Sequence, residues 1–144
     1  MMNKTHKDIL YPELSYKLCG LFYRIHNELK RFCNEKQYAD ALENLLKSEN
    51  VKYEREKSLP PSFEGENERR NIPDFIIEDV IVLDLKAKRI ITKDDYYQMR
   101  RYLNAFNKKL GLIVNFREYY LTPKRILNKF VDSNKDLNHS NNAL

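Results

Sequence analysis

The chain has 144 residues and a net charge of +5, and apolar residues make up 42% of it. This length is typical of one domain with a sizeable core. No apolar run approaches the roughly 18 residues of a membrane span, and the N-terminus lacks the apolar stretch of a signal peptide. We therefore expect a cytoplasmic protein that does not contact membranes. Cys19 and Cys33 lack the spacing of a zinc site or a disulfide framework.

The first third of the chain predicts two amphipathic helices. Pro12 suits a first helical turn, and apolar residues then recur every three or four positions to about Lys30. Asn34 can cap a second helix that runs to about Glu49. Glu35 begins the otherwise apolar face of this second helix. Its carboxylate therefore either points inward or stays in solvent, where it complements the helix dipole.

Three strands are expected next. Residues 51–59 alternate in the manner of a sheet-edge strand, and two prolines end it. Residues 72–88, with the sequence IPDFIIEDVIVLDLKAK, predict two strands that are buried in the middle of a sheet and joined by a tight turn at Glu78-Asp79.

The rest of the chain predicts a third helix and a further strand. Thr92 and Asp95 form a start resembling a capping box, and the helix continues to about Phe106. Residues 110–116, LGLIVNF, form a continuous apolar strand, which a short segment follows. We expect one domain over residues 1–128 and a polar, disordered tail over residues 129–144.

Charged residues interrupt the apolar central hairpin. Asp74 lies in its first strand, whereas Asp84, Lys86 and Lys88 lie two apart in the second and so leave the sheet on one face. Burying a carboxylate costs several kcal/mol unless it is paired or binds a cation. A divalent metal is the simplest explanation. The alternative is that Asp74 caps backbone donors while Asp84 and Lys86 form an ion pair.

The arrangement of Asp74 and the run Asp84-Leu85-Lys86 resembles the PD-(D/E)xK nuclease signature, with Pro73 directly before the first acid. This superfamily has a further acid on the preceding helix, and its RecB-like branch has Gln-x-x-x-Tyr on the following helix. The matching positions in this chain are Glu35, and Gln98 with Tyr102.

Over about residues 11–126 the chain is also similar to the small GxxExxY proteins, which are grouped within that superfamily. Their helical segment is matched here by His26, Leu29, Glu35 and Tyr38. Two family glycines are replaced by Lys30 and Phe32, and aspartate replaces the usual glutamate at position 84. Loss of both glycines implies a different shape for the turn that enters the second helix.

The resemblance implies an α/β fold with a restriction-endonuclease-like core, in which helices flank a central mixed β-sheet in the order ααβββαβ. It assigns four metal ligands: Asp74, Asp84, Glu35 and the backbone carbonyl of Leu85. Lys86 would orient and help to deprotonate the attacking water, with a pKa lowered by burial and nearby cations, or would stabilise the developing charge. Gln98 and Tyr102 would hold the lysine or a phosphate oxygen.

This set of residues predicts Mg²⁺-dependent hydrolysis of phosphodiester bonds in DNA, with Mn²⁺ able to substitute. Residues 86–129 contain twelve lysines and arginines against three acids, which favours a nucleic-acid partner. The candidates for phosphate contacts, each of which is otherwise a solvated surface charge, are Lys88, Arg100, Arg101, Lys108, Lys109 and Arg125.

Two alternatives to a nuclease stay open. One is a nuclease-fold module that binds nucleic acid and has weak catalytic turnover or none. The missing glycines favour this alternative. The other is a structural or protein-interaction domain. A homo-oligomer or a protein partner that supplies specificity is compatible with each of these functions.

Overall fold

The computed structural model describes residues 10–58, 61, 63–67 and 72–129. These residues form an α/β domain with the element order ααβββαββ. The elements are α1 (Pro12–Leu29), α2 (Glu35–Ser48), β1 (Tyr53–Arg55), β2 (Phe75–Ile77), β3 (Ile81–Lys86), α3 (Lys93–Phe106), β4 (Leu110–Asn115) and β5 (Lys124–Leu127). The α/β class with a mixed sheet is therefore confirmed. The expected disordered tail lies, apart from residue 129, outside the described residues.

The five strands form one sheet in the order β1-β2-β3-β4-β5, and only β3 and β4 are parallel neighbours. Helix α3 connects these two strands, as a parallel pair requires. Strand β5 was not predicted from the sequence. Its four residues include one buried side chain, Ile126, so the segment is too short and too polar to show strand periodicity.

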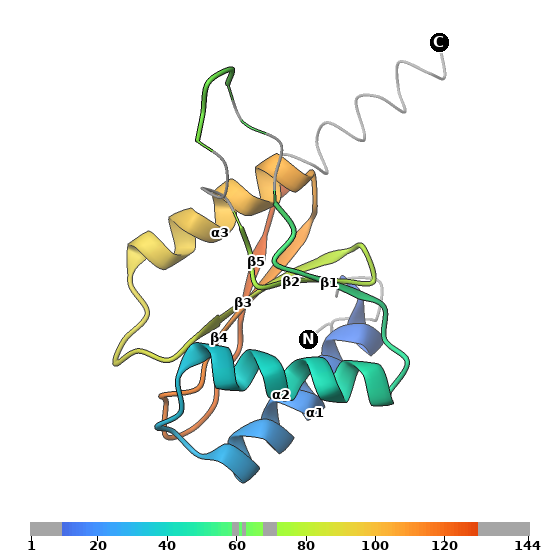
Figure 1. Cartoon of the computed structure of the whole chain (residues 1–144), viewed down its shortest axis with the longest axis vertical. Coiled ribbons are helices and arrows are strands. Elements are labelled where there is room, and N and C mark those ends of the chain that lie inside the picture. The colour runs from blue at the N-terminus through green and yellow to red at the C-terminus, as the bar shows by residue number, and fades with distance from the viewer. Residues whose placement is uncertain (1–9, 59–60, 62, 68–71, 130–144) are drawn as a thin grey trace, which may run out of the picture.

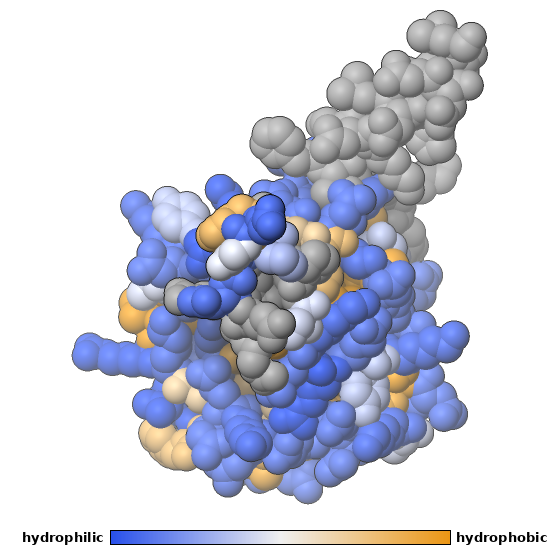
Figure 2. Space-filling view, turned by 45° about the horizontal axis from the view of Figure 1, so that its top comes forward, coloured by the Kyte–Doolittle hydropathy of each residue, from blue (hydrophilic) through white to orange (hydrophobic). Residues whose placement is uncertain are grey.

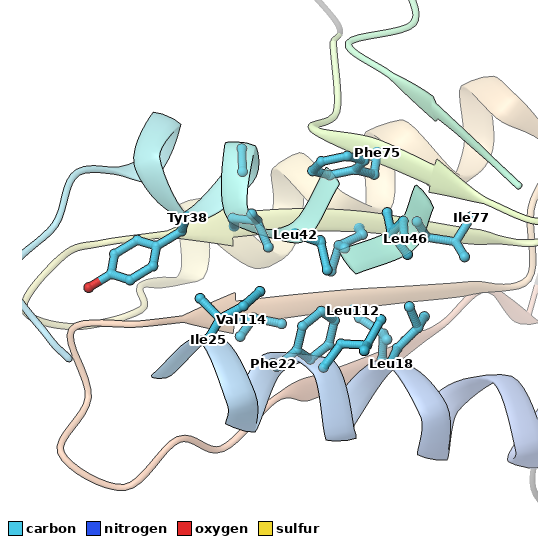
Figure 3. Close-up of a cluster of buried hydrophobic side chains, with 14 of the residues drawn as sticks. Leu18, Phe22, Ile25, Tyr38, Leu42, Leu46, Phe75, Ile77, Leu112 and Val114 are labelled. Atoms are coloured by element: carbon cyan, nitrogen blue, oxygen red, sulfur yellow. The ribbon is translucent and has the colours of Figure 1, made fainter. Parts of the chain in front are cut away.

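The sheet separates two cores, and alternation along β3 decides which side chain enters which core. Ile81, Leu83 and Leu85 face the larger core beneath α1 and α2. Figure 3 shows this cluster, with Phe22 from α1 and Leu42 from α2 meeting apolar side chains of the sheet. Residues at even positions of β3 face α3 on the other side (Figure 1). The two charged residues of β3, at positions 84 and 86, therefore lie on the α3 side.

The smaller core holds α3 close to β4. Val82 and Ile113 contribute from the sheet, and Met99 and Leu103 contribute from the helix. Gly111 makes the close approach possible, because a Cβ atom at this position would overlap the Met99 side chain. This packing fixes the position of α3 relative to the carboxyl end of β3.

The outer surface is mostly polar. Figure 2 shows hydrophilic residues over most of one face, with hydrophobic residues in separate spots. None of the described helices combines the length and the apolarity needed to cross a bilayer.

The turn between α1 and α2 keeps a conformation typical of glycine although it contains none. Lys30 has φ 65° and ψ −149°. Residues other than glycine are strained in this region, at a cost of about 1–3 kcal/mol. Its carbonyl accepts a hydrogen bond of 2.6 Å from the Tyr38 hydroxyl, which in turn accepts one of 3.2 Å from the Cys33 N–H. Lys30 therefore has a backbone conformation that favours glycine, and the expected difference from the turn of the family stays a prediction. Phe32 does not have a positive φ, so its position does not require glycine.

We expect Lys30→Gly to raise the free energy of unfolding by about 1 kcal/mol, because relief of strain exceeds the added entropy of the unfolded chain. Urea denaturation measures the change. The matched control is Lys47→Gly near the end of α2, which should lower stability by about 1 kcal/mol. Equal destabilisation by both substitutions would contradict a strained turn.

Candidate active site

Two acidic side chains meet across the β2–β3 hairpin. Phe75 pairs with Leu83 and Ile76 with Val82, so the same register places Asp74 directly opposite Asp84. Both carboxyl groups leave the sheet toward α3. An Asp74 oxygen also accepts a hydrogen bond of 2.6 Å from the Leu85 N–H. The alternating pattern of the hairpin therefore builds a carboxyl pair at the carboxyl end of β3.

Burial and the neighbouring charge of Asp84 change the titration of Asp74. Burial is the largest cause that raises the pKa of Asp74, and the charge of Asp84 adds to it, so that the pKa reaches about 8. The backbone N–H of Leu85 opposes this rise, whereas a hydrogen bond to Asp84 supports it. Asp74 therefore keeps its proton to a higher pH than an exposed carboxyl group does, because the pKa of Asp74 is raised.

Lys86 lies beside this pair. Its ammonium is 2.7 Å from an Asp84 carboxylate oxygen and 3.7 Å from an Asp95 oxygen, and it donates a hydrogen bond of 2.9 Å to the Gln98 side chain. Burial alone would lower the pKa of Lys86, but Asp84, Asp95 and Glu35 together raise it above its usual range. The direction is opposite to that expected from the sequence, because three carboxylates surround the ammonium.

Asp95 is a site residue that the sequence analysis identified only as a helix cap. One of its oxygens accepts from the Thr92 N–H at 2.8 Å and from Lys88 at 2.8 Å. Burial would raise the pKa of Asp95, but Lys88, the Thr92 N–H and Lys86 hold it below its usual range. The Thr92–Asp95 spacing was a usable signal, since a capping carboxylate must lie at the helix start, near the end of β3.

Asn115 was also missed. It is 1% exposed, and its side chain donates to the Lys88 carbonyl at 2.7 Å and accepts from the Lys88 N–H at 3.1 Å. This contact fixes the chain that leaves β3. In the sequence, Asn115 is a single amide residue at the end of an apolar strand. This pattern does not distinguish a functional residue from an ordinary strand end.

Glu35 lies near the pair but does not join it. It is the first residue of α2, its capping residue is Asn34, and its side chain is exposed. Partial desolvation raises its pKa, and its charge interacts with Lys86, Asp84, Lys88 and Asp95. Both readings of the sequence hold in part, because the carboxylate is at the solvent-facing rim of the site.

The Tyr102 hydroxyl lies on the other side of the pair and contacts the backbone. It donates to the Ile72 carbonyl at 3.2 Å, close to the start of β2. Burial and the charges of Asp84 and Asp74 raise the pKa of Tyr102. Gln98 therefore contacts the lysine, whereas Tyr102 secures the segment before Asp74.

The residues expected to contact phosphate lie in different parts of the structure, and only some of them are near the candidate site. Lys88 is at the site, and Arg100 and Arg101 are exposed on α3. Lys108 pairs with Asp79 at 3.0 Å, at the hairpin turn and thus at the opposite end of β3. Lys109 directly precedes β4 at that same end. Arg125 donates to Ser15 at 2.9 Å and to the Leu10 carbonyl at 3.0 Å, so it secures the start of α1.

The donor set fits a hard divalent cation that keeps several waters. Asp74 and Asp84 lie opposite each other, and a cation bound between them would relieve the repulsion that helps to raise the pKa of Asp74. Among the described residues no group of three or more His, Cys, Asp or Glu side chains has the spacing of a metal cluster. The expected three-carboxylate cluster is therefore not formed. One or two carboxylates suffice for Mg²⁺.

Comparison with known proteins agrees with this geometry. A family model described as the PD-(D/E)XK nuclease superfamily matches residues 12–126. The chain belongs to the PD-(D/E)XK nuclease superfamily. No curated protein and no solved structure matches the chain. Its five-stranded mixed sheet with three helices is consistent with the restriction-endonuclease-like core of this superfamily.

Membership in the PD-(D/E)XK nuclease superfamily suggests a nuclease-type function and a nucleic-acid substrate, because most members are hydrolases that use divalent metals. The narrower resemblances, to GxxExxY proteins and to the RecB-like branch, stay predictions. The assignment of Asp74, Asp84 and Lys86 to the signature of the superfamily also stays a prediction.

We expect the stability of the protein to fall between about pH 4 and pH 8. Asp74 has a pKa of about 8 in the folded protein and near 4 when unfolded, so in this range the folded state binds the extra proton. Its contribution is complete below pH 4 and is lost as the pH rises through 8, at most about 1.4 kcal/mol per pH unit. Denaturation of the protein and of Asp74→Asn, compared from pH 5 to pH 9, measures this. Parallel pH profiles would contradict the raised pKa.

Proposed function

We propose that the chain is a Mg²⁺-dependent nuclease that hydrolyses phosphodiester bonds in DNA. The observation that supports this most is the Asp74–Asp84 pair beside Lys86, on the side of the sheet that α3 covers. Two buried carboxyl groups in contact destabilise a fold unless a proton or a cation lies between them. Such a pair is therefore better explained by a reaction than by stability.

Four groups would hold the metal. Asp74, Asp84 and the Leu85 carbonyl are proposed as direct ligands, and Glu35, at the rim, as a ligand through water. Mn²⁺ would replace Mg²⁺, since both prefer oxygen ligands. When bound, the ion supplies a lowered pKa for the attacking water and a positive charge for the phosphate.

Lys86 would act as a charged group in this reaction. Asp84, Asp95 and Glu35 raise the pKa of Lys86, which favours a positively charged ammonium that can neutralise negative charge on phosphate. Gln98 holds the ammonium in place through its hydrogen bond, and Asp95 balances the charge. Lys88, Arg100 and Arg101 are proposed to contact backbone phosphates, which gives affinity without sequence choice.

A second candidate is a nuclease-fold module that binds nucleic acid without cutting it. The 2.7 Å ion pair between Lys86 and Asp84 favours it, because this contact occupies a proposed metal ligand. The exposed position of Glu35 also favours it. The ion pair uses one oxygen of Asp84. A nuclease must therefore bind its metal through the other oxygen or displace the lysine, whereas a binding module needs neither.

We expect the purified protein to nick plasmid DNA in Mg²⁺ or Mn²⁺, and Lys86→Ala to reduce the rate by at least about 100-fold with DNA binding retained. The matched control is Lys108→Ala, which removes an ion-paired lysine at the opposite end of β3 and should keep its activity. Binding without metal-dependent nicking would favour the binding module.

We also expect Mn²⁺ to raise the melting temperature, because a ligand that binds only the folded state stabilises it, by about 2.7 kcal/mol at a hundred times its dissociation constant. Asp84→Asn should abolish the shift. Asp79→Asn, which removes an acid at the hairpin turn, should leave it unchanged. An equal shift in both variants would place the ion elsewhere.

A further inference from the structure

A group of exposed rings and arginines lies next to the candidate active site. We call it the aromatic–arginine surface, and it consists of Arg31, Phe32, Arg89, Arg117, Tyr119 and Tyr120. Phe32, Tyr119 and Tyr120 have exposed fractions of 77%, 69% and 80%. Together with Glu118, the six residues line an open hollow of about 470 Å³, in which three arginines outnumber the one acid. It adjoins a second hollow of about 510 Å³ beside α1. Exposed rings gathered in one hollow indicate a binding surface.

This surface is held in place by two segments that are far apart in the sequence. In Figure 1 the turn between α1 and α2 lies beside the loop between β4 and β5. His26 donates to the Glu118 carbonyl at 2.8 Å, and the Arg31 Nε donates to the Arg117 carbonyl at 2.8 Å. The two hydrogen bonds fix the loop on the turn. The rings are therefore arranged before any ligand binds.

The guanidinium groups lie over the rings instead of pairing with acids. The central carbon of Arg31 is 5.3 Å from the Phe32 ring centre and 5.6 Å from that of Tyr119, and that of Arg117 is 5.5 Å from Phe32. Within the described part of the chain neither arginine has a carboxylate in ion-pair range, and the Arg117 Nε is buried without an acceptor. By contrast, Arg55 pairs with two acids.

The surface begins directly beside the proposed catalytic lysine. Asn115 is the register partner of Lys86, and the Phe116 N–H donates to the Lys86 carbonyl at 2.9 Å. Arg117 follows Asn115 by two residues, in the turn that ends β4. The loop that carries Arg117, Tyr119 and Tyr120 therefore starts at the carboxyl end of β3, where Lys86 lies.

We infer that the aromatic–arginine surface binds unpaired nucleotides by base stacking, so that the substrate is a single strand or a duplex with a single-stranded end. The inference rests on the proposed function and specifies its substrate class. Base faces are free to stack on rings only where bases are unpaired, and cationic groups between the rings match the phosphates. The unpaired arginines favour a polyanion over a neutral protein surface.

Anisotropy of a labelled thymidine oligonucleotide, measured in EDTA so that no cleavage occurs, tests the inference. We expect Phe32→Ala and Tyr119→Ala each to weaken binding of the single strand by about 5- to 100-fold, and to change binding of a blunt duplex by less than 2-fold. Tyr16→Ala, which removes a tyrosine that is 83% exposed elsewhere on α1, is the matched control. Equal losses for strand and duplex, or none, would overturn stacking.

A second measurement reports the stacking contact itself. The chain has no tryptophan, so Phe32→Trp introduces a single one. A stacked base should quench its fluorescence as the strand saturates the protein, whereas Tyr16→Trp should stay unquenched. Saturation without quenching in Phe32→Trp would overturn the inference. Melting temperatures within 2 °C of the parent protein should show that each variant is folded, since all three side chains are exposed.

Failure of this inference is distinguishable from failure of the proposed function. Metal-dependent nicking without stacking would support the proposed nuclease and contradict the preference for unpaired nucleotides. Stacking without nicking would support binding of unpaired nucleotides and contradict the proposed nuclease.

Discussion

The contact between Asp74 and Asp84 is the constraint on which the rest of the structure depends. Strand alternation and hairpin register place the two carboxyl groups opposite each other, on the side of the sheet that α3 covers. Burial, together with the charge of Asp84, raises the pKa of Asp74 to about 8. A hairpin selected for stability alone would carry apolar or oppositely charged residues here.

Asp95, at the start of α3, balances the positive charges of the two lysines beside this pair. Asp95 caps that helix and also pairs with Lys88, while its second oxygen lies 3.7 Å from Lys86. Through Asp95, the position of α3 therefore contributes to the raised pKa of Lys86. Gly111 permits that position by allowing the helix to approach β4, so the packing of the smaller core affects the surroundings of Lys86.

The turn between α1 and α2 connects the site with the proposed substrate surface. Tyr38 packs in the large core, stacks at 4.3 Å on Phe116, and uses its hydroxyl to hold the strained Lys30 carbonyl. One side of this turn presents Glu35 to the site, and the other presents Phe32 to the aromatic–arginine surface. Strain of this kind, held by the surrounding structure, is typical of functional segments.

The sequence by itself determined the α/β class, the three helices, the central hairpin and which face of β3 carries charge, because these follow from local periodicity and turn chemistry. It did not determine β5, whose four residues carry no periodic signal and gain order only by pairing with β4. Nor did it determine the direction of the Lys86 pKa or the part played by Asp95. Those depend on distances between side chains of α3 and β3, which are fixed only when the tertiary structure packs the helix against the sheet.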